Sequence, residues 1–146
     1  MRLLITLFIL GTTSSFAQQI DYNLKKGYAA EGYDVVAYFS NEALEGNKEY
    51  ATEYDGVKFK FASQENLETF KANPDKFVPQ YGGYCAYAIA VKSKKFGVNP
   101  ETFEIRDGKL YLFYNSGRNN TLESWIEKGA KGLQKKADKN WEAIKY

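Results

Sequence analysis

The sequence predicts an α+β domain: a small antiparallel sheet of two Asp-Gly hairpins, with helices packed on one face. Two observations carry this prediction. Alternating residue patterns surround an Asp-Gly pair at 55–56 and again at 107–108. Apolar residues at helical spacing follow each hairpin. Asp-Gly is a strong hairpin signal, because both residues of the two-residue turn take positive φ.

The first 17 residues have the features of a secretory signal peptide. Arg2 precedes the apolar run LLITLFILG, and the small residues Ser15 and Ala17 stand three and one positions before a cleavage site. We expect cleavage after Ala17, an exported protein in the periplasm or outside the cell, and a single domain over residues 18–146. No later segment approaches the roughly 20 apolar residues of a transmembrane helix, so no membrane anchor is expected.

Three further segments have readable patterns. Residues 32–40, GYDVVAYFS, fit either a buried strand or a helical turn. A helix is expected from the cap Ser63 to the stop at residues 73–74, Asn-Pro. The tail, residues 120–144, has apolar residues at helical spacing. Its glycines at 129 and 132 are expected to divide it into two helices, with Trp125 and Trp141 against the sheet. No repeat is apparent.

The composition excludes several kinds of site. The chain has no histidine, one cysteine and one methionine, the initiator, so a Ser-His-Asp or Cys-His catalytic set cannot form. A zinc or copper site with imidazole ligands is excluded for the same reason. With 20 basic and 18 acidic side chains the net charge is +2, and no nucleic-acid partner is expected.

The stretch PQYGGYCAYAIAV, residues 79–91, contains the single cysteine, Cys85. Three interpretations stay open. Cys85 is a small buried residue, a ligand or contact residue in a pocket, or a thiol made reactive at the start of a helix over 84–91. The pocket interpretation gives these candidate ligand-binding residues: Cys85, Tyr81, Gly82, Gly83, Tyr84 and Tyr87. The glycine pair also fits a tight turn, and Asp34 a cap or turn residue.

Residues 53–77, EYDGVKFKFASQENLETFKANPDKF, resemble the core of the YHS domain family. The matching positions, in order, are Tyr54, Gly56, Phe59, Phe61, Ser63, Phe70, Asn73, Pro74 and Phe77. GYDVVAYF, PQYGGYCAYA and DGKLYLFYN resemble an exported bacterial subgroup. The resemblance implies an α+β fold and kinship with TRASH-type domains, which are linked to metal handling through cysteines. Those cysteines would align with Ala62 and Asn66, so the usual metal ligands are missing here.

These observations favour a binding module, for a soft metal ion or a small ligand near Cys85, over an enzyme. No catalytic residue is assigned, and the one candidate metal ligand is Cys85, which makes a metal ion the only cofactor considered. The first alternative is a thiol-dependent enzyme or redox sensor that uses Cys85. The second is a protein-interaction domain that docks a partner through exposed aromatic side chains.

Overall fold

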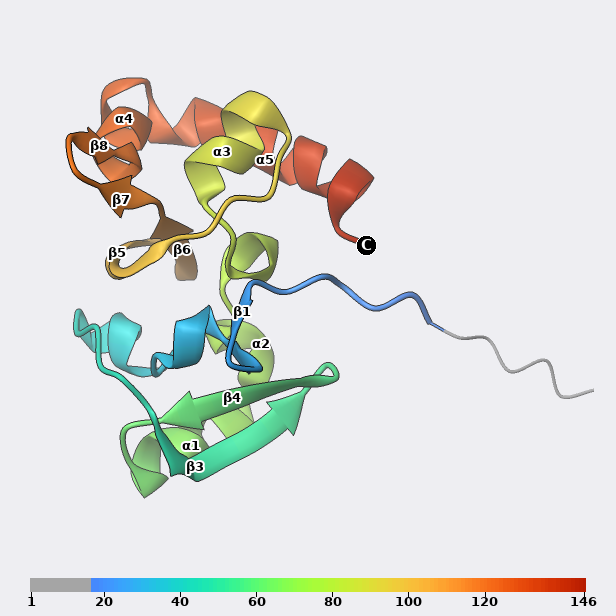
Figure 1. The fold of residues 1–146 in the computed structure, drawn as a ribbon, viewed down its shortest axis with the longest axis vertical. Helices are drawn as coiled ribbons and strands as arrows, with labels where there is room; N and C mark the ends of the chain where they lie inside the picture. The colour runs from blue at the N-terminus through green and yellow to red at the C-terminus, as the bar shows by residue number, and fades with distance from the viewer. Residues whose placement is uncertain (1–16) are drawn as a thin grey trace, which may run out of the picture.

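A computed structural model describes residues 17–146 of the chain. The expected signal peptide, residues 1–17, lies outside this range except for Ala17. Among the described residues, no helix combines the length and apolar character that crossing a membrane requires. The elements, in chain order, are β1 (Leu24–Lys25), β2 (Tyr28–Ala29), the 3₁₀ turns η1 (Ala30–Gly32) and η2 (Ala37–Ser40), β3 (Asn47–Tyr54), β4 (Val57–Phe61), α1 (Gln64–Ala72), α2 (Pro74–Phe77), η3 (Gln80–Gly83), α3 (Ala86–Lys92), β5 (Asn99–Arg106), β6 (Lys109–Phe113), β7 (Asn115–Ser116), β8 (Asn119–Asn120), α4 (Thr121–Glu127) and α5 (Ala130–Ile144) (Figure 1).

The α+β class and both Asp-Gly hairpins are confirmed, but the hairpins lie in separate sheets rather than in one. Strand β4 pairs with β3 on one edge and with β2 on the other, in the order β1-β2-β4-β3. The β2–β4 pair is parallel, with Tyr28 opposite Lys58. The β5–β6 hairpin pairs with no strand of this sheet and forms its own, as does the short β7–β8 pair.

Local turn and cap chemistry accounts for the element boundaries. Asp55 and Asp107 both have φ of 51°, with their glycines also at positive φ, as a two-residue hairpin turn requires. Ser63 Oγ accepts the N–H of Asn66 at 3.1 Å and begins α1. Gly129, at φ 92°, separates α4 from α5, whereas the second tail glycine lies inside α5. Residues 32–40 form no strand: Ala37–Ser40 make the 3₁₀ turn η2, and Tyr33 makes an isolated antiparallel bridge with Glu45.

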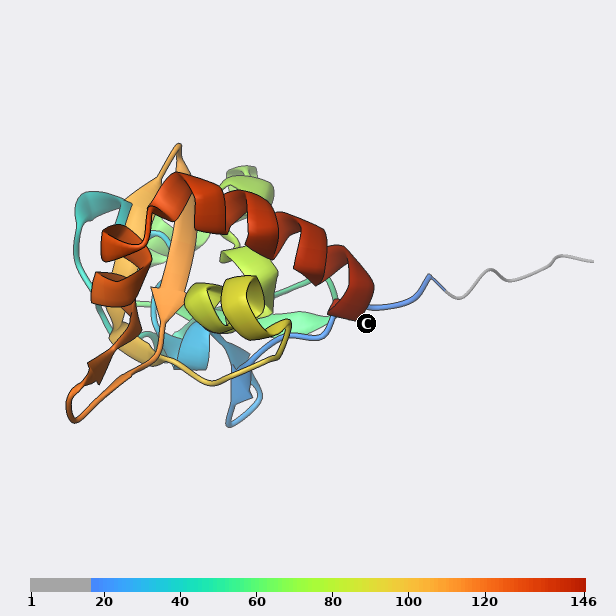
Figure 2. The ribbon, with the colours of Figure 1, turned by 90° about the horizontal axis from the view of Figure 1, so that it is seen from above.

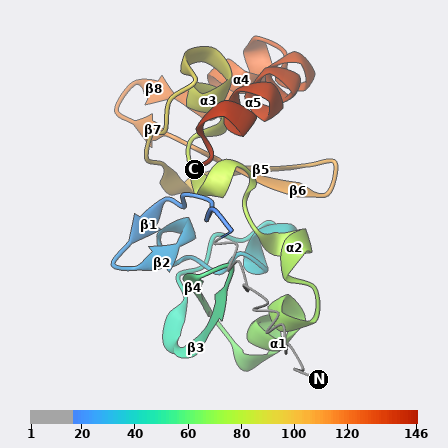
Figure 3. The same ribbon diagram turned by 90° about the vertical axis from the view of Figure 1, so that its right-hand side faces the viewer.

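Two apolar cores share strand β6. Leu110 and Leu112 face the first core, which contains the aromatic residues of β4 and α1. Tyr111 and Phe113 face the second core, where Trp125 packs on both rings as expected. Trp141 belongs to the same core, but its ring contacts are to Tyr81 and Tyr84 rather than to the sheet. Figure 3 shows the β5–β6 hairpin between the layer of α3, α4 and α5 and the part of the chain that holds β1–β4, and Figure 2 shows α3 beside α5. Strand alternation therefore makes β6 part of both cores.

Candidate functional site

Cys85 is fully buried and lies immediately before α3, rather than in its first turn. Its N–H donates to the carbonyl of Phe96 at 3.0 Å, and its carbonyl accepts the N–H of Ile89 at 3.1 Å. These two bonds fix the cysteine between the loop that follows α3 and the helix itself.

The thiol of Cys85 takes part in a short chain of hydrogen bonds. The sulfur lies 3.4 Å from Thr121 Oγ1, at the start of α4. Thr121 Oγ1 donates to the carbonyl oxygen of Tyr114 at 2.6 Å. A carbonyl cannot donate, so the threonine hydrogen is used there and the thiol is the donor toward Thr121. The arrangement therefore fits a neutral thiol, whereas a nucleophile must be a thiolate.

A cavity of about 290 Å³ borders Cys85. We call it the Cys85 cavity, and its lining residues are Cys85, Tyr87, Ala88, Lys92, Phe96, Tyr114, Asn119 and Thr121. Three aromatic side chains give it apolar walls, and Phe96 and Tyr114 remain partly exposed at 41% and 37%. The Nζ of Lys92 lies 5.1 Å from the centre of the Phe96 ring. Apolar walls with a few polar groups are typical of small-molecule sites, and this volume fits a small ligand.

The structure brings two of the six predicted site residues to the cavity, Cys85 and Tyr87. Tyr81 points instead into the second core, where its hydroxyl donates to Asp138 at 2.8 Å. The hydroxyl of Tyr84 donates to Asp21 at 3.1 Å. Burial raises the pKa of Tyr84 to about 12, with Asp21 contributing, and raises that of Tyr81 further, mainly by burial and then by the bond to Asp138.

The glycine pair forms a tight turn rather than a ligand cradle. Gly82 and Gly83 have φ of 61° and 81°, in the left-handed region. A Cβ on Gly82 would lie 2.3 Å from the carbonyl oxygen of Asp21. The N-terminal segment thus occupies the space beside Gly82, and the N–H of Asn23 donates to its carbonyl at 2.9 Å.

Sequence reasoning missed six cavity residues: Ala88, Lys92, Phe96, Tyr114, Asn119 and Thr121. They come from α3, from the loop after it, from the segment between β6 and α4, and from the first residue of α4. A lysine, a phenylalanine and a tyrosine in such segments also fit ordinary surface positions. No local signal in the sequence indicates that these segments meet.

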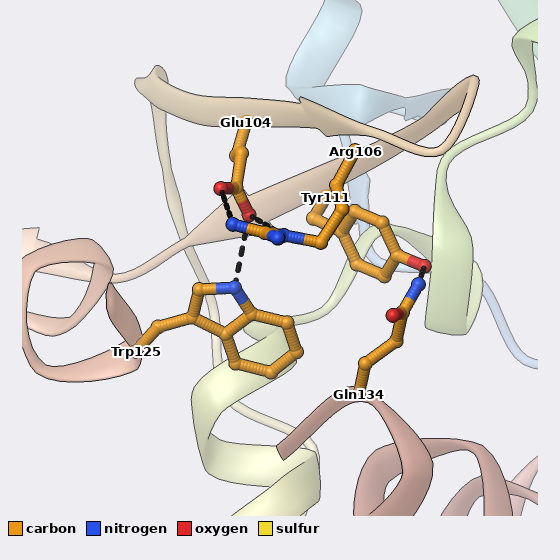
Figure 4. A network of polar contacts seen from close by, with 5 residues as sticks. All are labelled: Glu104, Arg106, Tyr111, Trp125 and Gln134. Carbon is orange, nitrogen blue, oxygen red and sulfur yellow. Dashed lines mark hydrogen bonds and ion pairs between the residues drawn. The ribbon is translucent and has the colours of Figure 1, made fainter. Parts of the chain in front are cut away.

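Helix α4, which carries Thr121, is held on β5 by a polar network (Figure 4). The indole N–H of Trp125 donates to Glu104 Oε2 at 2.9 Å. Arg106 donates two hydrogen bonds to the same carboxylate, at 3.1 and 2.6 Å. Trp125 is fully buried, so its N–H needs a partner, and Glu104 provides it. Gln134 of α5 donates to the hydroxyl of Tyr111 on β6. The network fixes α4, and with it Thr121, relative to the sheet.

Asp34 is a buried carboxylate that caps a turn and accepts hydrogen bonds from positions 62 and 66, where the resemblance would place the family's cysteines. Its Oδ1 accepts the N–H groups of Val36 and Ala37, at 2.9 and 3.1 Å. Its Oδ2 accepts the N–H of Ala62 at 2.8 Å and the side-chain amide of Asn66 at 2.7 Å. Positions 62 and 66 thus present hydrogen-bond donors where the family's cysteines would align, and a metal ion does not fit there.

The rest of the described chain shows no better metal centre. Within residues 17–146, no group of three or more His, Cys, Asp or Glu side chains is placed to hold a metal ion.

Part of the chain matches a known domain family. A family model for the YHS domain matches residues 40–81. No curated protein and no solved structure matches the chain. The matched segment runs from the end of η2 through β3, β4, α1 and α2 into η3. It therefore covers much of the first core and ends four residues before Cys85, so the Cys85 cavity lies outside it.

Proposed function

We propose that this chain, whose residues 40–81 match the YHS domain, is an exported module that binds a small organic ligand in the Cys85 cavity. The observation that carries the proposal is the cavity itself, about 290 Å³ with three aromatic walls beside a buried polar pair, Cys85 and Thr121. Aromatic walls bury the body of a small ligand, and a few polar groups orient it.

The start of the described chain supports export. The side chain of Gln19 donates to the carbonyl of Asp55 at 2.8 Å, and the N–H of Asp21 donates to the carbonyl of Lys145 at 2.8 Å. Gln19 and Asp21 follow the expected cleavage site at Ala17 by two and four residues, so a mature chain that begins at Gln18 would keep both contacts.

The geometry of Cys85 favours a ligand contact over covalent chemistry. The chain contains no histidine to act as base. The thiol is buried and donates to Thr121, so a thiolate would lose this bond and face the lone pairs of an oxygen. A ligand in the cavity touches Cys85 without changing its protonation.

Amide NMR spectra of the protein, in the form that its cells produce, test the proposal. Phenol, benzamide, benzoate and benzylamine are titrated as one-ring probes of different charge. At least one is expected to shift the amide signals of Tyr87, Ala88 and Tyr114 in a saturable manner. An Ala88→Leu variant, which fills the cavity, should abolish these shifts, and Ala143→Leu, on an exposed face of α5, should keep them. If none of the four probes shifts the cavity residues, the proposal is wrong.

Zinc gives a second readout. One thiol without histidine or a second cysteine cannot form the closed four-ligand site of structural zinc. We expect weak zinc binding by the monomer, weaker still in Cys85→Ser. If the monomer bound one zinc ion tightly, the proposed ligand would be a metal ion and not an organic molecule.

A further inference from the structure

Residues 29–72 and 80–127, here the first and second units, share one backbone plan at an offset of 51 or 52 residues. Each begins with three consecutive residues at positive φ, 30–32 in the first unit and 81–83 in the second, between 50° and 83°. In each, the residue after the turn donates its N–H to the first residue of the turn at 3.0 Å. Runs of three left-handed residues are rare, so their recurrence at the same place in both units is informative.

The hairpins of the two units have the same register. The first pair is Asn47 with Phe61 in one and Asn99 with Phe113 in the other, and in both the register shifts directly after this pair. Each asparagine accepts the N–H of the glutamate two residues later at 3.0 Å. Each hairpin then closes on Asp-Gly. The two units are therefore copies of one structural motif, although few of their residues are identical.

Cys85 is the counterpart of Asp34. Both follow a Gly-Tyr pair, and both are fully buried. The N–H of Asp34 donates to the carbonyl of Leu44 at 2.8 Å, and the N–H of Cys85 donates to that of Phe96, 52 residues after Leu44, at 3.0 Å. The second unit thus has a thiol where the first has a carboxylate.

The groups that bind the Asp34 carboxylate also have counterparts. In the first unit the N–H groups of residues 36, 37 and 62 donate to it. Their counterparts are Tyr87, Ala88 and Tyr114, and all three line the Cys85 cavity. The side chain of Cys85, at the N-cap of α3, accepts no hydrogen bond from the N–H groups of the helix. Within residues 17–146, none of these three N–H groups has a hydrogen-bond acceptor.

The cavity exists because the second unit has an insertion. In the first unit two residues lead from β4 to α1, whose Asn66 reaches the carboxylate. In the second unit the β7–β8 hairpin separates β6 from α4. Asn119 of this insertion and Thr121 line the cavity instead.

We infer that the Cys85 cavity binds the carboxylate of a small organic acid, in the place that the Asp34 carboxylate occupies in the first unit. The inference rests on the proposed function and names its ligand class. The inference depends on the parallel with the Asp34 carboxylate in the first unit. It does not depend on the helix dipole of α3, which has only seven residues. The apolar part of the acid lies against the rings of Tyr87, Phe96 and Tyr114.

The charge at the cavity agrees with an anionic ligand. Lys92 is the only charged residue among those that line the cavity, so no carboxylate side chain lines it. Among the described residues, Lys92 forms no ion pair; its Nζ lies over the ring of Phe96. An anion held by N–H groups and an ammonium gains charge-assisted hydrogen bonds, which are roughly twice as strong as neutral ones.

Benzoate and benzamide test the inference, because they share a shape and differ in charge. Benzoate is expected to bind at least about tenfold more tightly than benzamide, in line with the strength of charge-assisted bonds. Lys92→Gln should weaken benzoate binding several-fold and leave benzamide unchanged, while Lys131→Gln on the exposed face of α5 changes neither. If benzamide binds as tightly as benzoate, the inference fails and the proposed function stands. If neither these nor the other probes bind, the proposed function itself fails.

Cys85→Asp gives a second, independent test. The new carboxylate can accept the N–H groups of Tyr87, Ala88 and Tyr114, as its counterpart does in the first unit. We expect a folded variant that no longer binds benzoate, whereas Cys85→Ala keeps binding. A folded Cys85→Asp variant with unchanged benzoate affinity would overturn the inference. If this variant does not fold, the effect of Lys92→Gln on benzoate against benzamide decides.

Discussion

The carboxylate of Asp34 is expected to be among the most important polar groups for stability. It accepts four hydrogen bonds at 2.7–3.1 Å while fully buried. Asp34→Asn keeps the size of the side chain and turns one oxygen into an NH₂ group. If the remaining oxygen continues to accept from Val36 and Ala37, the NH₂ group faces the N–H of Ala62 and the amide of Asn66, which are both donors.

The cost of this substitution can be worked out from these contacts. Asn66 restores one bond by rotating its amide so that its oxygen accepts. The N–H of Ala62 stays without an acceptor, at about 1–3 kcal/mol. The two bonds that persist lose their charge assistance. We therefore expect a loss of about 2–4 kcal/mol, less than the roughly 5–15 kcal/mol that holds an ordinary domain folded.

Urea unfolding followed by circular dichroism measures this loss. With a slope of about 2 kcal/mol per molar urea, the midpoint of Asp34→Asn should fall by about 1–2 M. Asp107→Asn is the matched control, because asparagine tolerates the left-handed conformation of that turn residue and no side-chain bond is lost; its midpoint should move by less than about 0.3 M. A shift in Asp34→Asn no larger than in this control would refute the reasoning.

Three other predictions concern the termini, the thiol and the tyrosines. Mass spectrometry of the secreted protein should give a chain that begins at Gln18, and a product that retains Met1 would contradict export. Cys85 should resist iodoacetamide in the native protein and react fully in denaturant, because it is buried; rapid native labelling would revive the reactive-thiol alternative. The contribution of Tyr84 to stability should be fully present below pH 10, the ordinary value for tyrosine, and fall as the pH rises toward 12, because burial raises the pKa of Tyr84 to about 12 and the unfolded chain loses its proton first. Urea midpoints against pH, with Tyr84→Phe showing a shallower fall, check the last prediction.

Local chemistry explains which parts of the fold could be predicted. The Asp-Gly turns, the Ser63 cap and the break at Gly129 depend on residues within one turn of each other, and all were predicted. Whether the two hairpins share a sheet depends on strand pairing between segments that are distant in the sequence. For this reason the predicted single sheet was wrong in detail while the α+β class was right.

The same limit applies to the candidate site, where only Cys85 and Tyr87 of the six predicted residues line the cavity. A pattern around Cys85 suggested its neighbours in sequence, but Tyr81 and Tyr84 turn toward Asp138 and Asp21. The actual neighbours follow Cys85 by up to 36 residues, as Thr121 does. The repeat was also invisible in the sequence, because the two units share backbone conformation and hydrogen bonds with few identical residues.

Comparison of the two units gives a physical reason for a thiol at position 85. In the first unit, the Asp34 carboxylate satisfies three backbone N–H groups and closes the space around them, which stabilises the fold and leaves no binding site. In the second unit, the thiol of Cys85 is bound to Thr121 and leaves the counterpart N–H groups to a ligand. A site of this kind lowers the stability of the free protein, and its ligand restores it in proportion to concentration. The carboxylate that the second unit lacks is, on this argument, the one its ligand supplies, so benzoate should raise the urea midpoint of the protein and leave that of Cys85→Asp unchanged.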